Sequence, residues 1–80
     1  MFTVYILTSK QYPDRTYIGL TEDLSKRMDA HNAGQSPYSK KYGPWELTAY
    51  TTFKNKQKAV EFEKYLKSGS GFAFLKKHFL

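Results

Sequence analysis

The segment from Tyr17 to Asn32 constrains the fold more than any other part of the chain. It opens with β-favouring residues that end at Gly19, where the backbone can turn freely. Thr21 is placed to cap a helix whose first turn is acidic, as the positive end of a helix dipole favours. Gly34 provides the stop of that helix. We therefore predict that a strand ends and a helix begins within a few residues, and that the helix runs to about Asn32.

Two ionisable side chains, Arg27 and His31, stand four residues apart on this predicted helix. Residues at that spacing lie on one face, so a guanidinium and an imidazole are expected side by side. They border the apolar stripe of Leu24 and Met28 and should sit at the edge of the core. Two structural alternatives are open: Arg27 could pair with Asp23, and His31 could serve as a cation at the helix C-terminus.

The N-terminal part of the chain predicts a pair of strands. Residues 2–8 are β-branched and aromatic, without glycine or proline, and they alternate between two largely apolar faces. This pattern suits a well-covered central strand. Because the loop at 9–15 is short, residues 16–20 should return as an antiparallel neighbour. Tyr5 and Tyr17 would then approach each other.

The remaining elements complete an α+β fold. Residues 34–44 read as a polar, mobile loop, residues 45–53 as a third strand and residues 56–67 as a second long helix. The glycines and serines at 68–71 read as the stop of that helix, and residues 72–79 as a short amphipathic helix. The order β-β-α-β-α-α predicts a three-stranded antiparallel sheet with helices packed on it. We expect residues 1–80 to form a single domain.

Composition limits the classes of function. The chain has no cysteine and a net charge of +6, with most of the excess lysine in its second half. Such a charge favours a polyanion as partner. No apolar run approaches the roughly 20 residues that span a membrane, so a cytoplasmic protein is expected. The two histidines, His31 and His78, are not in a zinc-binding spacing.

A carboxylate stands inside an apolar stripe of the second long helix. At about 100° per residue, Glu63 falls between Ala59 and Val60, whereas Glu61 falls on the opposite, wet face. A carboxylate aimed toward a core is costly unless a partner compensates it. The partner could be a metal ion, Arg27 or a lysine, and a simple salt bridge is the structural alternative.

Taken in order, these elements resemble the GIY-YIG nuclease superfamily. The similarity is to small stand-alone bacterial members that are related to the N-terminal nuclease domain of the excision-repair UvrC protein. These small proteins also end in a Lys-Ser-Gly-x-Gly segment, like residues 67–71 here. Five ordered elements carry it: Thr3-Val4-Tyr5, Tyr17-Ile18-Gly19, Arg27, His31-Asn32 and Glu63 to Lys67.

The resemblance implies a metal-dependent endonuclease that hydrolyses DNA phosphodiester bonds in repair or recombination. Glu63 would hold one Mg²⁺ or Mn²⁺ ion. Tyr17 would hold or deprotonate the attacking water, His31 would accept a proton, and Tyr5 would shape the water network. Arg27 would stabilise the charge that develops on the phosphate. Four lysines are expected to contact the nucleic-acid backbone: Lys40, Lys41, Lys64 and Lys67.

The chain departs from the family pattern at Thr3, Leu20 and Phe72, which replace a glycine, a polar or basic residue and an arginine of relatives, and it lacks the asparagine that the repair nucleases carry near the C-terminus. Because 80 residues leave no room for a separate recognition domain, a second hypothesis is kept beside the nuclease. The fold could act as a catalytically weak nucleic-acid-binding or protein-adaptor module. DNA is the expected partner, RNA is not excluded, and a protein partner could supply the substrate specificity.

Overall fold

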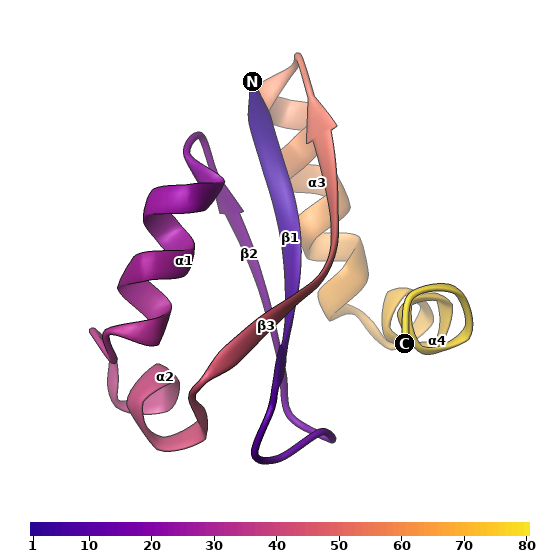
Figure 1. The fold of residues 1–80 in the computed structure, drawn as a ribbon. Helices are drawn as coiled ribbons and strands as arrows, with labels where there is room; N and C mark the ends of the chain where they lie inside the picture. Colours follow the sequence, from indigo (N-terminus) through magenta and orange to yellow (C-terminus); the bar gives the residue numbers. More distant parts are fainter.

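A central strand, β1 (Phe2–Ser9), divides the hydrophobic core into two halves. The computed structural model describes residues 1–80, and β1 lies between β2 (Thr16–Thr21) and β3 (Trp45–Phe53) in an antiparallel sheet of order β2-β1-β3. Both outer strands are sheet edges. The fold is α+β, as the sequence predicts, with a three-stranded antiparallel sheet between helices (Figure 1).

The alternation along β1 explains why helices cover both faces of the sheet. Val4 and Ile6 pack on one face with residues of α3 (Lys56–Lys67) and α4 (Gly69–His78). Tyr5 and Leu7 pack on the other face with Trp45 and with residues of α1 (Leu24–Asn32) and α2 (Pro37–Tyr42). Because each face buries bulky side chains, the apolar area removed from water stabilises the small domain from both sides.

The structure adds one helix to the predicted order. Residues 37–42, expected as part of a loop, form α2, whose start is fixed by a reciprocal pair of hydrogen bonds between Ser36 and Ser39 and by Pro37 at the first turn. The capping residue of α1 also differs from the prediction. Asp23, not Thr21, accepts the hydrogen bond from the Lys26 N–H.

The Gly-Ser-Gly segment begins a helix instead of only ending one. Ser68 terminates α3 and, through its side chain, accepts the N–H of Gly71 to cap α4. A Cβ at Gly71 would overlap the Tyr65 carbonyl, so glycine is what lets α4 approach the end of α3. No helix in the structure has the length and apolar character needed to cross a membrane.

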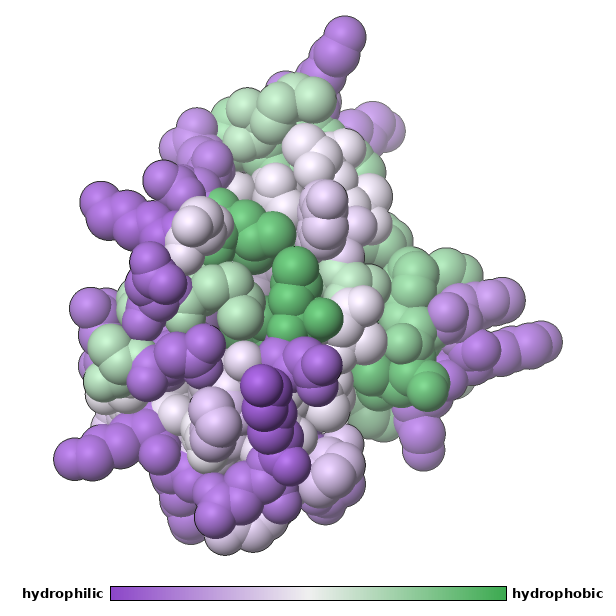
Figure 2. Space-filling model, in the orientation of Figure 1, coloured by the Kyte–Doolittle hydropathy of each residue, from purple (hydrophilic) through white to green (hydrophobic).

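The face of the molecule shown in Figure 2 combines two kinds of surface. Apolar surface gathers over α4, on the right of the view, and long hydrophilic side chains project beside it. Helix α4 contains the exposed Phe72 and carries Lys76 and Lys77 in its last turn, and Leu80, two residues beyond the helix, is exposed as well.

Candidate active site at the β2 edge

The side chain of Tyr5 lies across the neighbouring strand. In the β1–β2 ladder Tyr5 pairs with Gly19, and a Cβ at Gly19 would overlap the Oη and Cζ atoms of the tyrosine. The absence of a side chain at Gly19 therefore lets the ring pass over β2. The ring is 1% exposed, and its Oη lies 3.1 Å from Nε2 of His31.

Tyr17 joins the same cluster from β2. Its ring centroid is 4.4 Å from that of His31 and 6.2 Å from that of Tyr5. Trp45 contacts Tyr17 edge-on from the start of β3, at 6.3 Å between centroids. The predicted approach of Tyr5 and Tyr17 is confirmed, and both rings converge on the imidazole.

His31 is buried and favours its neutral form. Burial lowers the pKa of His31 below its usual 6.5, and the positive charge of Arg27 lowers it further. The alternative of a helix-terminal cation is disfavoured, although His31 does stand in the last turn of α1, because burial and the charge of Arg27 both oppose protonation of the ring. An uncharged imidazole at neutral pH can accept a proton.

Arg27 is exposed, and no carboxylate pairs with it. The only ion pair of the protein joins Glu63 and Lys67, so the alternative of an Arg27–Asp23 salt bridge is wrong. The Asp23 carboxylate is used instead in capping α1. The guanidinium is available to an anion that arrives from solution.

The Tyr5 hydroxyl stays protonated at neutral pH. Burial, with Tyr17 and Glu63 as smaller contributors and Arg27 opposing them, raises the pKa of Tyr5 to about 12. Charges on α1 and on α3 therefore both act on this hydroxyl, although the two helices cover opposite faces of the sheet.

Glu63 is partly accessible on α3. Its side chain is 21% exposed, and Oε2 lies 3.5 Å from Nζ of Lys67, one turn further along the helix. No group of three His, Asp or Glu side chains surrounds it. A lone carboxylate does not suit zinc, but it fits Mg²⁺ or Mn²⁺, which keep several ligands as water or phosphate oxygen.

Comparison with known proteins identifies the fold as that of a nuclease family. The sequence matches the family model described as the GIY-YIG catalytic domain over residues 1–77. The chain belongs to the GIY-YIG family. The resemblance noted in the sequence is therefore confirmed.

Relatives of this GIY-YIG chain are mostly small bacterial proteins. A UPF0213 protein of Clostridium perfringens is 40% identical over 80% of this chain and 68% of its own length. UPF0213 protein YsiG of Lactococcus lactis subsp. lactis is 40% identical over 82% of this chain and 62% of its own length. A structure-specific endonuclease subunit SLX1 homolog of Giardia intestinalis is 35% identical over 79% of this chain and 19% of its own length. The chain thus spans less than two thirds of two of these three relatives.

A solved structure agrees with the fold. The solution NMR structure of a UPF0213 protein from Bacillus halodurans superposes with a TM-score of 0.57 at 31% identity, and the match covers 96% of this chain and 84% of that chain.

The four lysines expected to contact nucleic acid lie at two places on the GIY-YIG fold. Lys40 and Lys41 are exposed in the last turn of α2, where the Lys41 amine lies 5.4 Å from the centroid of the Tyr42 ring. Lys64 and Lys67 are exposed in the last turn of α3. Of the four, only Lys67 contacts both Glu63 and the groove described next.

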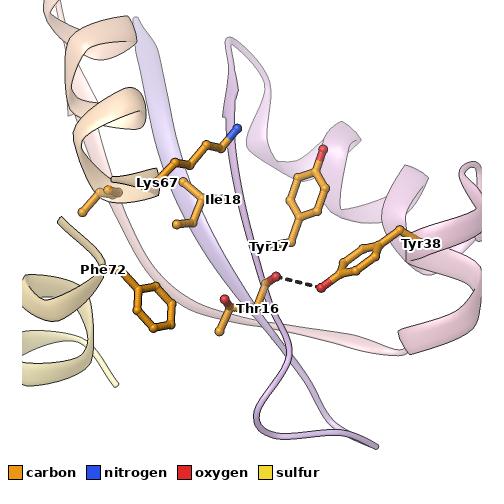
Figure 3. Close-up of a pocket in the computed structure, with 7 residues that line it drawn as sticks. Thr16, Tyr17, Ile18, Tyr38, Lys67 and Phe72 are labelled. Atoms are coloured by element: carbon orange, nitrogen blue, oxygen red, sulfur yellow. Dashed lines mark hydrogen bonds between the residues drawn. The ribbon is translucent and has the colours of Figure 1, made fainter. Parts of the chain in front are cut away.

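An open groove, here called the β2 groove, follows the outer edge of β2 and has a volume of about 420 Å³. Strand β2 forms its floor, α2 one wall and the α3–α4 junction the other (Figure 3). A smaller hollow next to it contains Arg27 and His31, and Tyr17 lines both spaces. Seven residues line the β2 groove: Thr16, Tyr17, Ile18, Tyr38, Leu66, Lys67 and Phe72.

Three residues were assigned no role at the site from the sequence: Tyr38, Trp45 and Asn32. Tyr38 stacks on Trp45 at 5.7 Å between centroids and lies 6.3 Å from Tyr17. Asn32 accepts the backbone N–H of Trp45 through its Oδ1, at 2.8 Å, and so ties the end of α1 to β3. The Ser36-Pro37 helix start was the available signal for Tyr38.

Proposed function

We propose that this GIY-YIG chain is a metal-dependent endonuclease that hydrolyses DNA phosphodiester bonds. The observation that carries the proposal is the convergence of two tyrosines on a neutral, buried imidazole, next to an arginine that no carboxylate pairs with. Phosphodiester hydrolysis needs a positioned water, a proton acceptor and a cation at the phosphate, and these side chains can supply all three.

The proposed roles follow from the protonation states. His31 accepts the proton of the attacking water, because its lowered pKa leaves the ring neutral near pH 7. Tyr17 holds that water, since its ring contacts the imidazole at the accessible side of the cluster. Tyr5 stays protonated, and in this proposal its Oη accepts the Nε2–H of His31, which keeps the ring in one orientation and leaves Nδ1 as the proton acceptor.

Arg27 binds the phosphate in this proposal. Its planar guanidinium can form two parallel hydrogen bonds to phosphate oxygens and stabilise the negative charge that develops on them. Its exposure beside His31 puts it within the same hollow as the proton acceptor.

Glu63 is the proposed ligand of one Mg²⁺ or Mn²⁺ ion. When bound, such an ion polarises the phosphate and stabilises the leaving oxygen. The partly exposed carboxylate can reach an ion once Lys67 gives up its ion pair. We further propose that the protein acts in the cytoplasm, in DNA repair or recombination.

Two features support a second candidate, a nucleic-acid-binding or adaptor module. Lys67 already neutralises the only carboxylate proposed for the metal, and no further ligands stand around it. The Giardia relative is named a structure-specific endonuclease subunit homolog, which is consistent with a partner protein that supplies substrate selection.

The test is cleavage of labelled duplex, flap, junction and single-stranded DNA, with an RNA strand in the panel, in Mg²⁺ or Mn²⁺. The nuclease proposal expects metal-dependent cleavage that is lost in Glu63→Ala and retained in Glu61→Ala, which removes an exposed carboxylate of the same helix. Binding without cleavage in all variants would refute the nuclease and support the adaptor.

A further inference from the structure

Two aromatic rings form opposite sides of the β2 groove. Phe72, on the first turns of α4, is 44% exposed, and Tyr38, on α2, is 37% exposed. Figure 3 shows them on either side of Thr16, with the Lys67 side chain reaching over the groove from α3. Neither ring is needed to fill the core, so both offer apolar area to a ligand.

The Tyr38 ring is held in place before any ligand arrives. The Tyr38 hydroxyl donates a hydrogen bond to the Thr16 carbonyl at 3.1 Å, and its ring stacks on Trp45. The Lys76 amine lies 5.8 Å from the centroid of the Phe72 ring. Rings that are already ordered lose little conformational freedom on binding, which favours affinity.

The charge of the groove is compatible with a polyanion that has apolar parts, once Lys67 gives up its ion pair with Glu63. Lys67 is the only charged residue among those that line it, and the chain carries a net charge of +6. Single-stranded nucleic acid combines a phosphate backbone with bases that stack on aromatic side chains. A duplex keeps its bases paired and stacked inside, where these rings cannot reach them.

The groove leads directly to the candidate active site. Tyr17 lines both the groove and the hollow with Arg27 and His31. A base held beside Phe72 would therefore bring a neighbouring phosphate to Tyr17. The volume of about 420 Å³ lies within the range of small-ligand sites.

The geometry points to the β2 groove as a binding site for an unpaired base of single-stranded DNA, stacked on Phe72 beside the phosphate to be cleaved. This inference rests on the proposed nuclease function for its choice of DNA, and it names the substrate class: single strands, or duplexes with unpaired bases next to the cleaved bond.

Binding can be tested separately from cleavage by working in EDTA. The probes are a fluorescent DNA strand of about 12 nucleotides, a strand of equal length with abasic residues, a blunt duplex and an RNA strand. We expect wild type to bind the base-containing strand about tenfold more tightly than the abasic one. Phe72→Ala should bring the affinities for the two strands close to equal, and Phe72→Trp should keep the preference for the base-containing strand.

The matched control is Tyr50→Ala, which removes an exposed ring of β3 that does not line the groove and should leave the ratio unchanged. Equal affinity of wild type for the two strands, or an unchanged ratio in Phe72→Ala, would overturn the inference. Tighter binding of the duplex or of RNA would overturn the choice of single-stranded DNA. If Phe72→Ala changed self-association, measured by sedimentation, and left the affinity ratio unchanged, the inference would be overturned. The groove would then be an interface between copies of the protein.

Cleavage assays with Mn²⁺ separate this inference from the proposed function. Base-dependent binding without cleavage of any DNA would refute the nuclease and leave the stacking site standing. Cleavage that is equally fast on duplex and single-stranded DNA, with no dependence on Phe72, would refute the stacking site and leave the nuclease standing.

Discussion

The ring of Tyr5 lies over Gly19 of the adjacent strand, and its hydroxyl reaches His31 beyond it. One strand register therefore determines both a pairing within the sheet and the position of a polar group in the candidate site. A glycine is required at this point because of the ring above it, and not because of its own backbone angles: Gly34 is the only residue with a positive φ.

Gly19→Ala is expected to disturb stability and the site together. The new methyl group would collide with Oη of Tyr5 and push the ring away from His31. We expect the free energy of unfolding to fall by about 1–3 kcal/mol, as in other overpacked sites, and cleavage to be largely lost. Urea unfolding and the cleavage assay measure the two effects. Gly69→Ala is the control, because nothing lies within 4 Å of that position; it should be neutral or slightly stabilising.

Stability should depend on pH through His31. The folded state lowers the pKa of His31 below 6.5, so the unfolded state binds the proton more readily. The free energy of unfolding should therefore hold above pH 6.5 and decline as the pH falls from there toward the lowered value. Urea unfolding at about pH 7.5 and about pH 5.5 measures the decline. His31→Gln should reduce this decline in the free energy of unfolding, and His78→Gln should leave it unchanged. A decline as large in His31→Gln as in wild type would contradict its assignment to His31.

Arg27→Ala should lower the single-turnover cleavage rate by about 10²–10³-fold, the range found when one donor to a developing negative charge is removed. Arg27→Lys should recover only part of the rate, since an ammonium cannot form the paired hydrogen bonds. Because the side chain is exposed, the free energy of unfolding should change by less than about 0.5 kcal/mol. Lys26→Ala, an exposed cation one residue away, is the control. An equal loss in both variants would reduce the role of Arg27 to general attraction of DNA.

Lys67→Gln should separate metal binding from DNA binding. The variant frees the Glu63 carboxylate, so Mn²⁺ should bind a few-fold more tightly in the absence of DNA, as measured by electron paramagnetic resonance. DNA should bind more weakly, because a groove cation is lost. Stability should change by less than about 1 kcal/mol, the usual value of an exposed ion pair. Lys64→Gln is the control and should leave the Mn²⁺ affinity unchanged. A weaker Mn²⁺ affinity in Lys67→Gln would contradict the idea that Lys67 and the metal ion compete for the Glu63 carboxylate.

Local patterns predicted the strands well, because each strand is marked by its own run of β-branched and aromatic residues. The two-sided apolar character of β1 indicated a central strand, and the structure places Val4 and Tyr5 in different halves of the core. The spacing of Arg27 and His31 correctly put the two side chains beside one hollow. The prediction that both lie at the edge of the core is wrong for Arg27, which extends to solvent, whereas His31 is buried and faces the two tyrosines.

The missed features depend on contacts between distant segments. Composition made residues 34–44 look like a loop, although Ser36-Pro37 is a local signal for the start of α2. A distant contact adds to that start: Ser39 accepts the indole N–H of Trp45 through its carbonyl, at 3.1 Å. The glycines at 69–71 are poor helix formers, and α4 nevertheless begins there because Gly71 packs against the backbone of α3. The β2 groove joins residues from four elements, so no single segment could reveal it.

The hydrogen bond from Tyr38 to the Thr16 carbonyl has a consequence for how copies of the protein meet. Strand β2 is an edge, and an open edge can recruit a strand from another molecule and start aggregation. The phenol occupies one of the acceptors that an incoming strand would need. The short helix α2 thus hinders pairing of β2 with a strand of another molecule, while the groove along the same edge stays open to a ligand.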